Sequence, residues 1–284
     1  MFKNSHDTLK MNIYRNSLTS YLLWRFVNKQ PRFRRLLQRI IYPNKNVSVT
    51  LIGANLNINT QKELGYWRAA KIQSSNVVFR DEIAQILTVS ALVDNSSIFV
   101  DCGANVGLWT CNIAKLGKIY PSLKVLSFEA NPDTFSRLEE SVSLLKNVRA
   151  VCCALSDSER ELEMFEAAGS CSFGVDRSDF NIATESRLMR AKPLDAFLDG
   201  LENIVLKVDV EGHELEVLQG AAAAFNRGAI KAVYLDGFAK NNRTAILEIL
   251  TNGGLSLVLN GRTLEPLQPT DYAILAVKPP PLKH

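Results

Sequence analysis

The chain has 284 residues, of which 46% are hydrophobic and 22% are charged, and its formal net charge is +4 at pH 7. This composition excludes an intrinsically disordered chain, and there is no run of 18 or more apolar residues to form a transmembrane helix. The start of the chain lacks the apolar stretch and cleavage site of a secretory signal. The five cysteines show no CxxC spacing, so we expect no disulfide framework, no bound metal and a cytoplasmic location.

The first 78 residues predict a basic helical extension followed by a possible hairpin. Residues 1–45 hold ten basic residues and one acidic residue. Apolar residues recur among them at helical spacing on both sides of Pro31, which would break a helix. Further on, Val47–Ile52 and Leu56–Ile58 flank a glycine turn, a pattern typical of two paired strands.

Two interpretations of residues 1–45 stay open. The segment could contact the inner, anionic face of a membrane, with its apolar residues inserted and its basic residues at the surface. It could instead pack as an arm on the sheet or on a second subunit of a homo-oligomer. We favour the packing arm, because the apolar residues within 18–26 are dense enough to need burial in either setting.

From residue 79 to residue 278 the predicted helices and strands alternate. Apolar strands are expected at 98–101, 124–128, 148–154, 204–208 and 229–235. Helices are expected at 81–92, 108–116, 135–145, 214–218 and 243–250. Short pieces within 160–190 indicate an inserted strand or loop, and two final strands at 255–259 and 272–277 flank a turn.

This alternation predicts an α/β fold. Strands that are apolar throughout are covered on both faces, which is typical of a Rossmann-like, doubly wound and mostly parallel sheet. The last two strands are close in sequence, so we expect an antiparallel closing strand. Residues 79–278 are therefore expected to form one α/β domain, and residues 279–284 a tail.

Asp101–Gly107, with the sequence DCGANVG, follows the first strand of this domain and precedes a helix. Glycine permits a positive φ and lets a ligand approach the backbone closely, and the first amides of the helix are free to bind it. Gly103 and Gly107 are four positions apart with Asn105 between them, which is related to the dinucleotide-binding fingerprint without matching it. Alone, the motif also fits a tight strand-to-helix turn that binds nothing.

Glu129 ends the second strand of the domain, 22 positions after Gly107. An ionised carboxylate at this place can accept hydrogen bonds from two ribose hydroxyls. Nicotinamide-dependent oxidoreductases and S-adenosylmethionine-dependent methyltransferases both combine these two elements. Asp101 favours the methyltransferase, because its carboxylate could face the cationic methionine end of that cofactor and would repel a dinucleotide pyrophosphate.

Asp209, Glu211 and His213 follow the fourth strand. The carboxyl ends of parallel strands face the ligand crevice, so these three are the candidate catalytic residues that bind the acceptor or remove its proton. For His213, a capping or solvent-facing role is an equal alternative. Nothing in the spacing demands a divalent cation.

Five motifs occur in order within residues 79–277: FVDCGANVG, FEANP, CALSD, LDAFL and LKVDVEGHELEVLQGA. Together they resemble the FkbM-type methyltransferases. The resemblance implies a class I methyltransferase fold and S-adenosyl-L-methionine as the methyl donor. It also implies O-methylation of a hydroxyl group on a sugar, a polyketide or another small metabolite, so the expected partner is a small-molecule or glycan acceptor.

The resemblance also assigns residues. It implies that Asp101, Gly103, Asn105 and Gly107 line the methionine end of the cofactor, that Glu129 holds its ribose, and that Ala154 lies beside its adenine. Asp236 stands where the family pattern leads us to expect a glutamate. A nicotinamide-dependent oxidoreductase and a non-catalytic binding protein that retains the pocket remain the alternatives. We expect no nucleic-acid partner, because the basic segment contains no recognised binding module.

Overall fold

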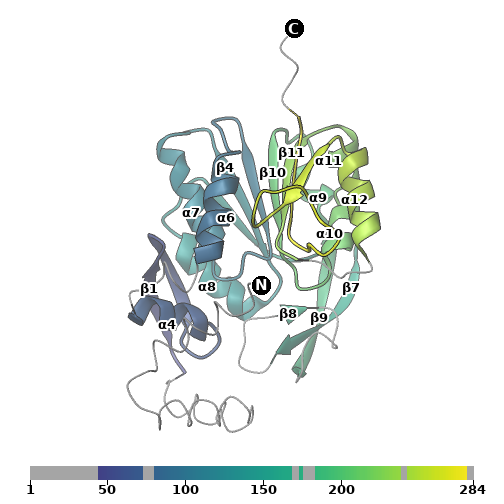
Figure 1. Cartoon of the computed structure of the whole chain (residues 1–284). Coiled ribbons are helices and arrows are strands. Elements are labelled where there is room, and N and C mark those ends of the chain that lie inside the picture. The colour runs from purple at the N-terminus through teal and green to yellow at the C-terminus, as the bar shows by residue number, and fades with distance from the viewer. Residues whose placement is uncertain (1–43, 73–79, 168–172, 175–182, 238–241, 280–284) are drawn as a thin grey trace, which may run out of the picture. The chain divides into compact units, whose positions relative to one another are not determined.

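The computed structural model describes residues 44–72, 80–167, 173–174, 183–237 and 242–279 (Figure 1). The helices expected within residues 1–42, and most of the expected tail, lie outside these ranges. The chain divides into two compact units, Met1–Lys45 and Asn46–His284. The division after residue 78 that the sequence suggested stays a prediction.

A seven-stranded sheet forms the centre of the larger unit, in the strand order β12-β13-β11-β10-β3-β4-β5. Its strands are β3 (Ile98–Cys102), β4 (Lys124–Glu129), β5 (Val148–Cys152), β10 (Ile204–Val208), β11 (Ile230–Leu235), β12 (Leu257–Asn260) and β13 (Ile274–Val277). Neighbouring strands from β11 to β5 pair in parallel, whereas β13 lies antiparallel to β11 and to β12. The expected Rossmann-like, doubly wound sheet with an antiparallel closing strand is confirmed.

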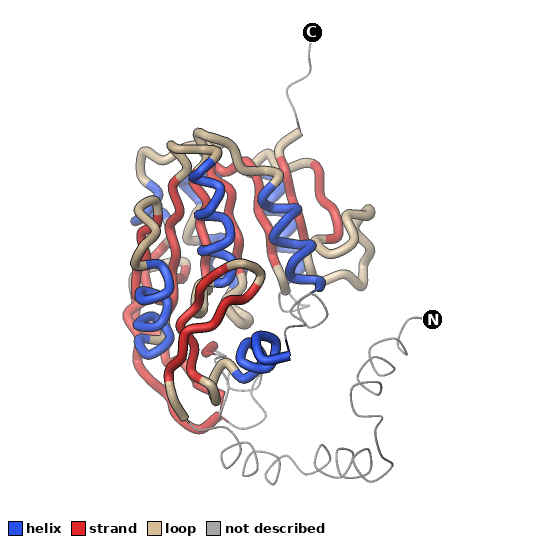
Figure 2. The backbone as a smooth tube through the Cα atoms, turned by 90° about the vertical axis from the view of Figure 1, so that its left-hand side faces the viewer, coloured by secondary structure: helices blue, strands red, loops and turns tan. Residues whose placement is uncertain are grey.

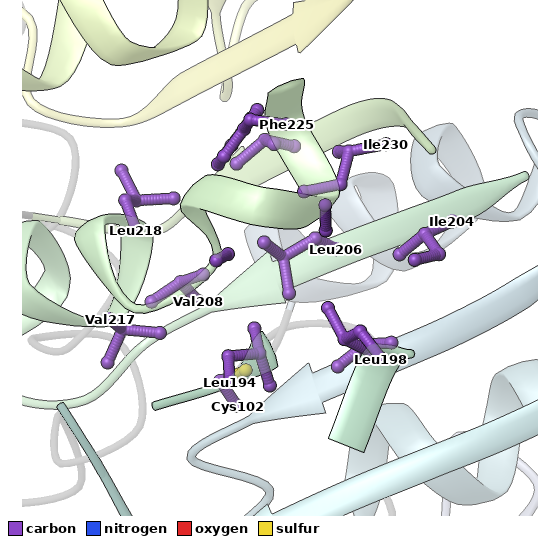
Figure 3. Close-up of a cluster of buried hydrophobic side chains, with 14 of the residues drawn as sticks. Cys102, Leu194, Leu198, Ile204, Leu206, Val208, Val217, Leu218, Phe225 and Ile230 are labelled. Atoms are coloured by element: carbon purple, nitrogen blue, oxygen red, sulfur yellow. The ribbon is translucent and has the colours of Figure 1, made fainter. Parts of the chain in front are cut away.

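Two apolar clusters pack on opposite faces of this sheet, because successive side chains of a strand point to opposite sides. The first cluster contains side chains of α9 (Asp195–Leu198), α10 (Glu214–Gln219), α11 (Ala222–Asn226) and α12 (Arg243–Asn252). The second contains side chains of α6 (Arg80–Ser90), α7 (Leu108–Ala114), which η1 (Lys115–Lys118) follows, and α8 (Pro132–Val142). Figure 3 shows the first cluster, where Leu206 and Val208 of β10 meet Val217 and Leu218 of α10.

The expected hairpin is confirmed: β1 (Asn46–Leu51) pairs antiparallel with β2 (Ala54–Asn59), and α4 (Leu64–Ile72) follows (Figure 2). Leu51, Leu56 and Ile58 are buried in the second cluster, among the side chains of α7 and α8. Glu63 forms a buried ion pair with Arg137 of α8, with 2.7 Å between Oε1 and Nη2. These contacts explain why the hairpin belongs to the larger unit.

A second, four-stranded sheet has the order β6-β9-β7-β8. Its strands are β6 (Ala154–Ser156), β7 (Arg160–Ala167), β8 (Phe173–Gly174) and β9 (Ala183–Pro193). The expectation of one continuous strand over 148–154 is therefore wrong. The chain leaves the main sheet at Cys153, whose N–H donates to the carbonyl of Glu129, and Ala154 then pairs with Ala191 of β9. Of the two alternatives for 160–190, inserted strands are observed.

No helix in the described ranges is long and apolar enough to cross a bilayer.

Candidate functional site

The site lies where the chain reverses the direction in which it adds strands. β4 and β5 extend the sheet on one side of β3, and β10 and β11 extend it on the other. In a doubly wound sheet the carboxyl ends of the strands at this switch point border the ligand crevice. Here those ends are Cys102 of β3 and Val208 of β10, which are register partners.

The turn after β3 brings two stretches of backbone into close contact. Gly103 has a φ of +77°, and a Cβ added to it would lie 1.9 Å from the carbonyl oxygen of Asp209. The N–H groups of Gly103 and Ala104 both donate to the carbonyl of Phe128, at 3.0 and 2.8 Å. Only glycine fits at this position, because the end of β10 crosses directly over it.

Gly107, which the resemblance assigns to the methionine end of the cofactor, is the last residue before α7. It caps the N-terminus of α7 with a φ of +96°, and a Cβ there would lie 2.8 Å from Cδ1 of Leu138. The glycine therefore allows α7 to start close against α8. Gly103 and Asn105 of this turn line a cavity, and Gly107 caps the helix that follows.

A cavity opens at the strand ends, and seven of the predicted site residues line it: Gly103, Asn105, Glu129, Ala154, Asp209, Glu211 and His213. The sequence analysis missed two apolar lining residues of β7, Leu162 and Met164, both of which are buried. Their alternation with charged residues along β7 was a visible signal, but nothing local indicated that this strand returns to the end of β5.

Glu129 presents a fixed carboxylate to this cavity. Its Oε2 accepts the N–H of Asn105 and its Oε1 accepts the N–H of Asn131, both at 2.9 Å. Burial raises the pKa of Glu129 to about 7, although both backbone hydrogen bonds act to lower it. Each oxygen keeps a lone pair, so the carboxylate can still accept two hydroxyl hydrogens from a ligand.

Asp101 lies inside the protein. Its side chain is fully buried, with Oδ1 3.0 Å from Nζ of Lys207, and its Oδ2 accepts the hydroxyl of Thr110 at 2.7 Å. The expectation that this carboxylate faces the cofactor directly does not match this arrangement. The physical reason is the register of β3 and β10, which sets Asp101 beside Lys207 on the face that α7 covers.

Lys207 joins three parts of the site. Besides its ion pair with Asp101, Nζ donates to the carbonyl of Gly103 at 2.9 Å and lies 3.6 Å from Oδ2 of Asp209. Burial alone would lower the pKa of Lys207, but Asp101 and Asp209 hold it above its usual value. The buried cation therefore fixes the glycine turn against the end of β10.

The turn after β10 is held by a buried glutamate. Glu211 and Gly212 both have positive φ, +54° and +99°. Glu214 accepts the N–H groups of Val210 and Gly212 through Oε1, at 3.3 and 3.0 Å. Burial raises the pKa of Glu214 to about 7. Glu214 lies in the first turn of α10, and no side-chain pattern in the sequence indicates its backbone partners.

A polar side chain lies beside each ring nitrogen of His213. Nε2 lies 3.0 Å from the hydroxyl of Ser156 at the end of β6, and Nδ1 lies 3.3 Å from Oε2 of Glu216. Burial lowers the pKa of His213, which Glu216 opposes and Arg160 reinforces. This ring ties α10 to β6 beside the cavity, an arrangement suited to positioning.

A second group of polar and aromatic side chains lies on the α6 and α7 side of the same strand ends, and sequence analysis singled out only Asp236 of it. Nε1 of Trp109 donates to Oε1 of Glu82 at 3.2 Å, and its ring stacks on that of Tyr234 with 5.2 Å between centroids. The hydroxyl of Tyr234 donates to Oδ1 of Asp236 at 2.9 Å. Nζ of Lys207 lies 6.0 Å from the centroid of the Trp109 ring and 3.6 Å from Oδ2 of Asp209, which connects this group to the cavity.

The fold is a doubly wound α/β sheet with a crevice at the switch point. The carboxylate of Glu129, at the end of β4, lines this crevice, and the carboxylates of Asp209, Glu82 and Asp236 lie near the ends of β10 and β11. Among the described residues, no group of three or more His, Cys, Asp or Glu side chains is arranged to hold a metal ion.

Comparison with known proteins identifies the family. The model of the methyltransferase FkbM domain matches residues 101–254, which include the glycine turn, Glu129 and the end of β10. The chain belongs to this family, whose members are S-adenosylmethionine-dependent methyltransferases, and the resemblance found in the sequence is confirmed.

Two curated relatives are methyltransferases by name. Methyltransferase sdnD of Sordaria araneosa is 29% identical over 194 residues, 55% of this chain and 72% of that protein. The hexuronic acid methyltransferase AglP of Haloferax volcanii is 27% identical over 205 residues, 68% of this chain and 79% of that protein. Among solved structures, Aeropyrum pernix fibrillarin with natively bound S-adenosyl-L-methionine covers 84% of this chain and 83% of its own, at 13% identity and a TM-score of 0.39.

Proposed function

We propose that this methyltransferase transfers a methyl group from S-adenosyl-L-methionine to a hydroxyl oxygen of a sugar, a glycan or another small metabolite. The observation that carries the proposal is the Glu129 carboxylate, which two backbone amides hold at the end of β4 with its remaining lone pairs toward the cavity. A ribose diol supplies the two donors that this carboxylate can accept. When bound, the cofactor supplies an electrophilic methyl group on a sulfonium.

The other cavity residues fit the same ligand. Ala154, Leu162 and Met164 offer an apolar wall on one side of Glu129, suited to an adenine ring. Gly103 and Asn105 line the cavity on the other side, which we assign to the methionine end. Asp209, ion-paired with Lys207, would accept a hydrogen bond from a ligand's amino or hydroxyl group at that end.

The three residues expected to be catalytic differ in what they can do. Asp209 lines the cavity and reaches both halves of the site, so we propose it for substrate contact. Glu211 lines the cavity but is exposed, so we propose it for the rim of the site. We propose that His213 is a positioning residue, because a base needs a ring nitrogen available to the acceptor.

The proposal of a hydroxyl acceptor is supported by chemistry and by one relative. AglP is named for hexuronic acid, a sugar acid, which makes a carbohydrate acceptor reasonable for this chain as well. Methylation of a hydroxyl needs alignment with the methyl group and a proton acceptor, and carboxylates on both sides of the crevice provide candidates for the second.

Calorimetry with the whole chain separates this proposal from its alternatives. S-adenosylhomocysteine should bind, while NAD and NADP should give no heat of binding at the same protein concentration. A nicotinamide-dependent oxidoreductase requires the reverse. A non-catalytic binding protein would bind S-adenosylhomocysteine yet leave labelled S-adenosylmethionine unchanged in the presence of every acceptor offered.

A further inference from the structure

Glu82 of α6 holds a distinctive position beside the crevice. Its carboxylate is half-buried, and Oε1 accepts the indole N–H of Trp109 at 3.2 Å. Trp109 is itself buried and fixed by stacking on Tyr234. Because one oxygen is fixed in this way, the orientation of the second oxygen is also set. Glu82 is thus a pre-oriented proton acceptor on the face of the sheet opposite α10.

Charged side chains at the ends of β10 and β11 act on the carboxylate of Glu82. Burial raises the pKa of Glu82 to about 7, and the carboxylates of Asp209 and Asp236 raise it further, whereas Lys207 and the Trp109 hydrogen bond lower it. A carboxylate of this strength is a better base than an ordinary glutamate and is still largely ionised just above neutrality. Contacts connect Glu82 to the cavity: Trp109, its hydrogen-bond partner, lies with its ring centroid 6.0 Å from Nζ of Lys207, which is 3.6 Å from Oδ2 of the cavity residue Asp209.

We propose that Glu82 is the general base that takes the proton from an uncharged acceptor hydroxyl, with Trp109 as its positioning residue. This inference rests on the proposed function. In the step, the O–H bond of the acceptor breaks and its proton passes to the carboxylate of Glu82. The oxygen forms a bond to the methyl carbon while the methyl–sulfur bond breaks, and that electron pair stays on sulfur.

The same charges select the acceptor. Glu82, Asp209 and Asp236 bring three carboxylates to this side, while Lys207 is bound to Asp101 and Arg262 pairs with Asp236 at 3.6 Å. An acceptor with its own carboxylate next to the reacting oxygen would be repelled. Hydroxyl groups of a neutral sugar instead donate hydrogen bonds to carboxylates. The acceptor class is therefore a neutral polyhydroxylated ring, in contrast to a hexuronic acid.

Other carboxylates nearby are less suited to be the base. Oδ1 of Asp236 is already engaged, because it accepts the Tyr234 hydroxyl and lies 3.6 Å from Nη2 of Arg262. Asp209 is ion-paired with Lys207. For Glu82, Trp109 is the hydrogen-bond partner among the described residues, and it engages only Oε1.

The test compares wild type, Glu82→Gln and the control Glu248→Gln, which changes an exposed carboxylate on α12. The acceptor probes are the methyl glycosides of glucose, galactose, mannose and rhamnose, each at several concentrations, and glucuronic and galacturonic acids as charged counterparts. Methyl transfer from labelled S-adenosylmethionine is measured between pH 5.5 and 9, and S-adenosylhomocysteine affinity is measured by calorimetry.

We expect wild type to methylate a neutral glycoside. Its kcat should increase as the pH rises through about 7, because Glu82 becomes ionised there. Glu82→Gln should lose kcat by about 10²- to 10⁴-fold and lose that acid limb, while KM and S-adenosylhomocysteine affinity change less than about 3-fold. Wild-type kcat in Glu82→Gln, or methylation of the uronic acids alone, would overturn the inference. The inference would also be overturned if wild type binds S-adenosylhomocysteine but methylates neither the neutral glycosides nor the uronic acids. Failure of wild type to bind S-adenosylhomocysteine is a different result, which refutes the proposed function itself.

Discussion

Replacing Glu129 by glutamine removes one acceptor from a place where the structure uses two. The carboxylate accepts the N–H groups of Asn105 and Asn131, and a glutamine side chain can satisfy only one of them, because its NH₂ group would face the other N–H. The unsatisfied amide should lower the free energy of unfolding by about 1–3 kcal/mol. Loss of a charged acceptor for a ribose hydroxyl should cost about 1.5–3 kcal/mol of binding, or about 10- to 150-fold in Kd.

Isothermal titration with S-adenosylhomocysteine measures the second effect, and urea denaturation measures the first. Glu161→Gln is the matched control, since Glu161 is an exposed glutamate of β7, the strand that also carries Leu162. Because burial raises the pKa of Glu129 to about 7, the affinity of wild type should also increase as the pH rises from 6 to 8, with protons released on binding.

The ribose-binding role of Glu129 would be refuted if the substitution affected stability alone. If Glu129→Gln unfolds at a lower urea concentration but binds S-adenosylhomocysteine as wild type does, the carboxylate serves only the backbone of the two turns. The ribose site would then have to be sought elsewhere along the crevice.

Four further expectations concern the fold, its charges and the N-terminal segment. Gly103→Ala should lower the free energy of unfolding by about 2–5 kcal/mol, because its Cβ meets the Asp209 carbonyl at 1.9 Å and φ is +77°. Gly200→Ala, at a φ of +66° with nothing within 4 Å, should cost only about 1–2 kcal/mol, and equal urea midpoints for the two variants would contradict the close crossing. Lys207→Met leaves the buried Asp101 carboxylate without its cation and should cost about 3–5 kcal/mol, of which the double variant with Asp101→Asn should recover a part; additive losses would argue against the pair. Burial raises the pKa of Glu82, Glu129 and Glu214 to about 7 from 4.5, so between these pH values the folded protein holds protons that the unfolded chain has released. The free energy of unfolding should therefore fall as the pH rises through that window, opposed in part by His213, and Glu214→Gln should flatten the slope; a rise in stability over the window would be inconsistent with three protonated glutamates. Finally, if residues 1–45 form a packing arm, as we propose, the whole chain should not sediment with anionic vesicles at low salt, whereas membrane contact at about 1 kcal/mol per basic residue would be easy to detect and would blue-shift Trp24 fluorescence.

The central sheet could be predicted because its strands are short apolar runs that alternate with helices. The order of motifs also placed Glu129, Asp209 and the glycine turn at one edge, since the carboxyl ends of parallel strands meet there. What the sequence could not give is how side chains far apart along the chain pair across strands. Asp101 was expected to face a ligand, yet its position is decided by Lys207, which lies on a strand formed by residues much later in the chain.

Other features escaped prediction for related reasons. The break between β5 and β6 depends on pairing with β9, which follows an insertion of more than twenty residues. Glu82 and Trp109 lie in helices where a single glutamate or tryptophan has no motif around it, and only their meeting in space indicates chemistry. The hairpin was predicted from its turn, but its attachment to the sheet depends on α7 and α8.

The most direct test of the account is to follow the methyl group itself. The whole chain is incubated with S-adenosylmethionine that carries a deuterated methyl group and with the neutral methyl glycosides, and the products are analysed by mass spectrometry. We predict a glycoside that has gained the deuterated methyl group on oxygen, formed in equal amount with S-adenosylhomocysteine. If S-adenosylhomocysteine does not form above the protein-free rate with any acceptor, although the protein is folded, the assignment of methyl transfer to this crevice is contradicted.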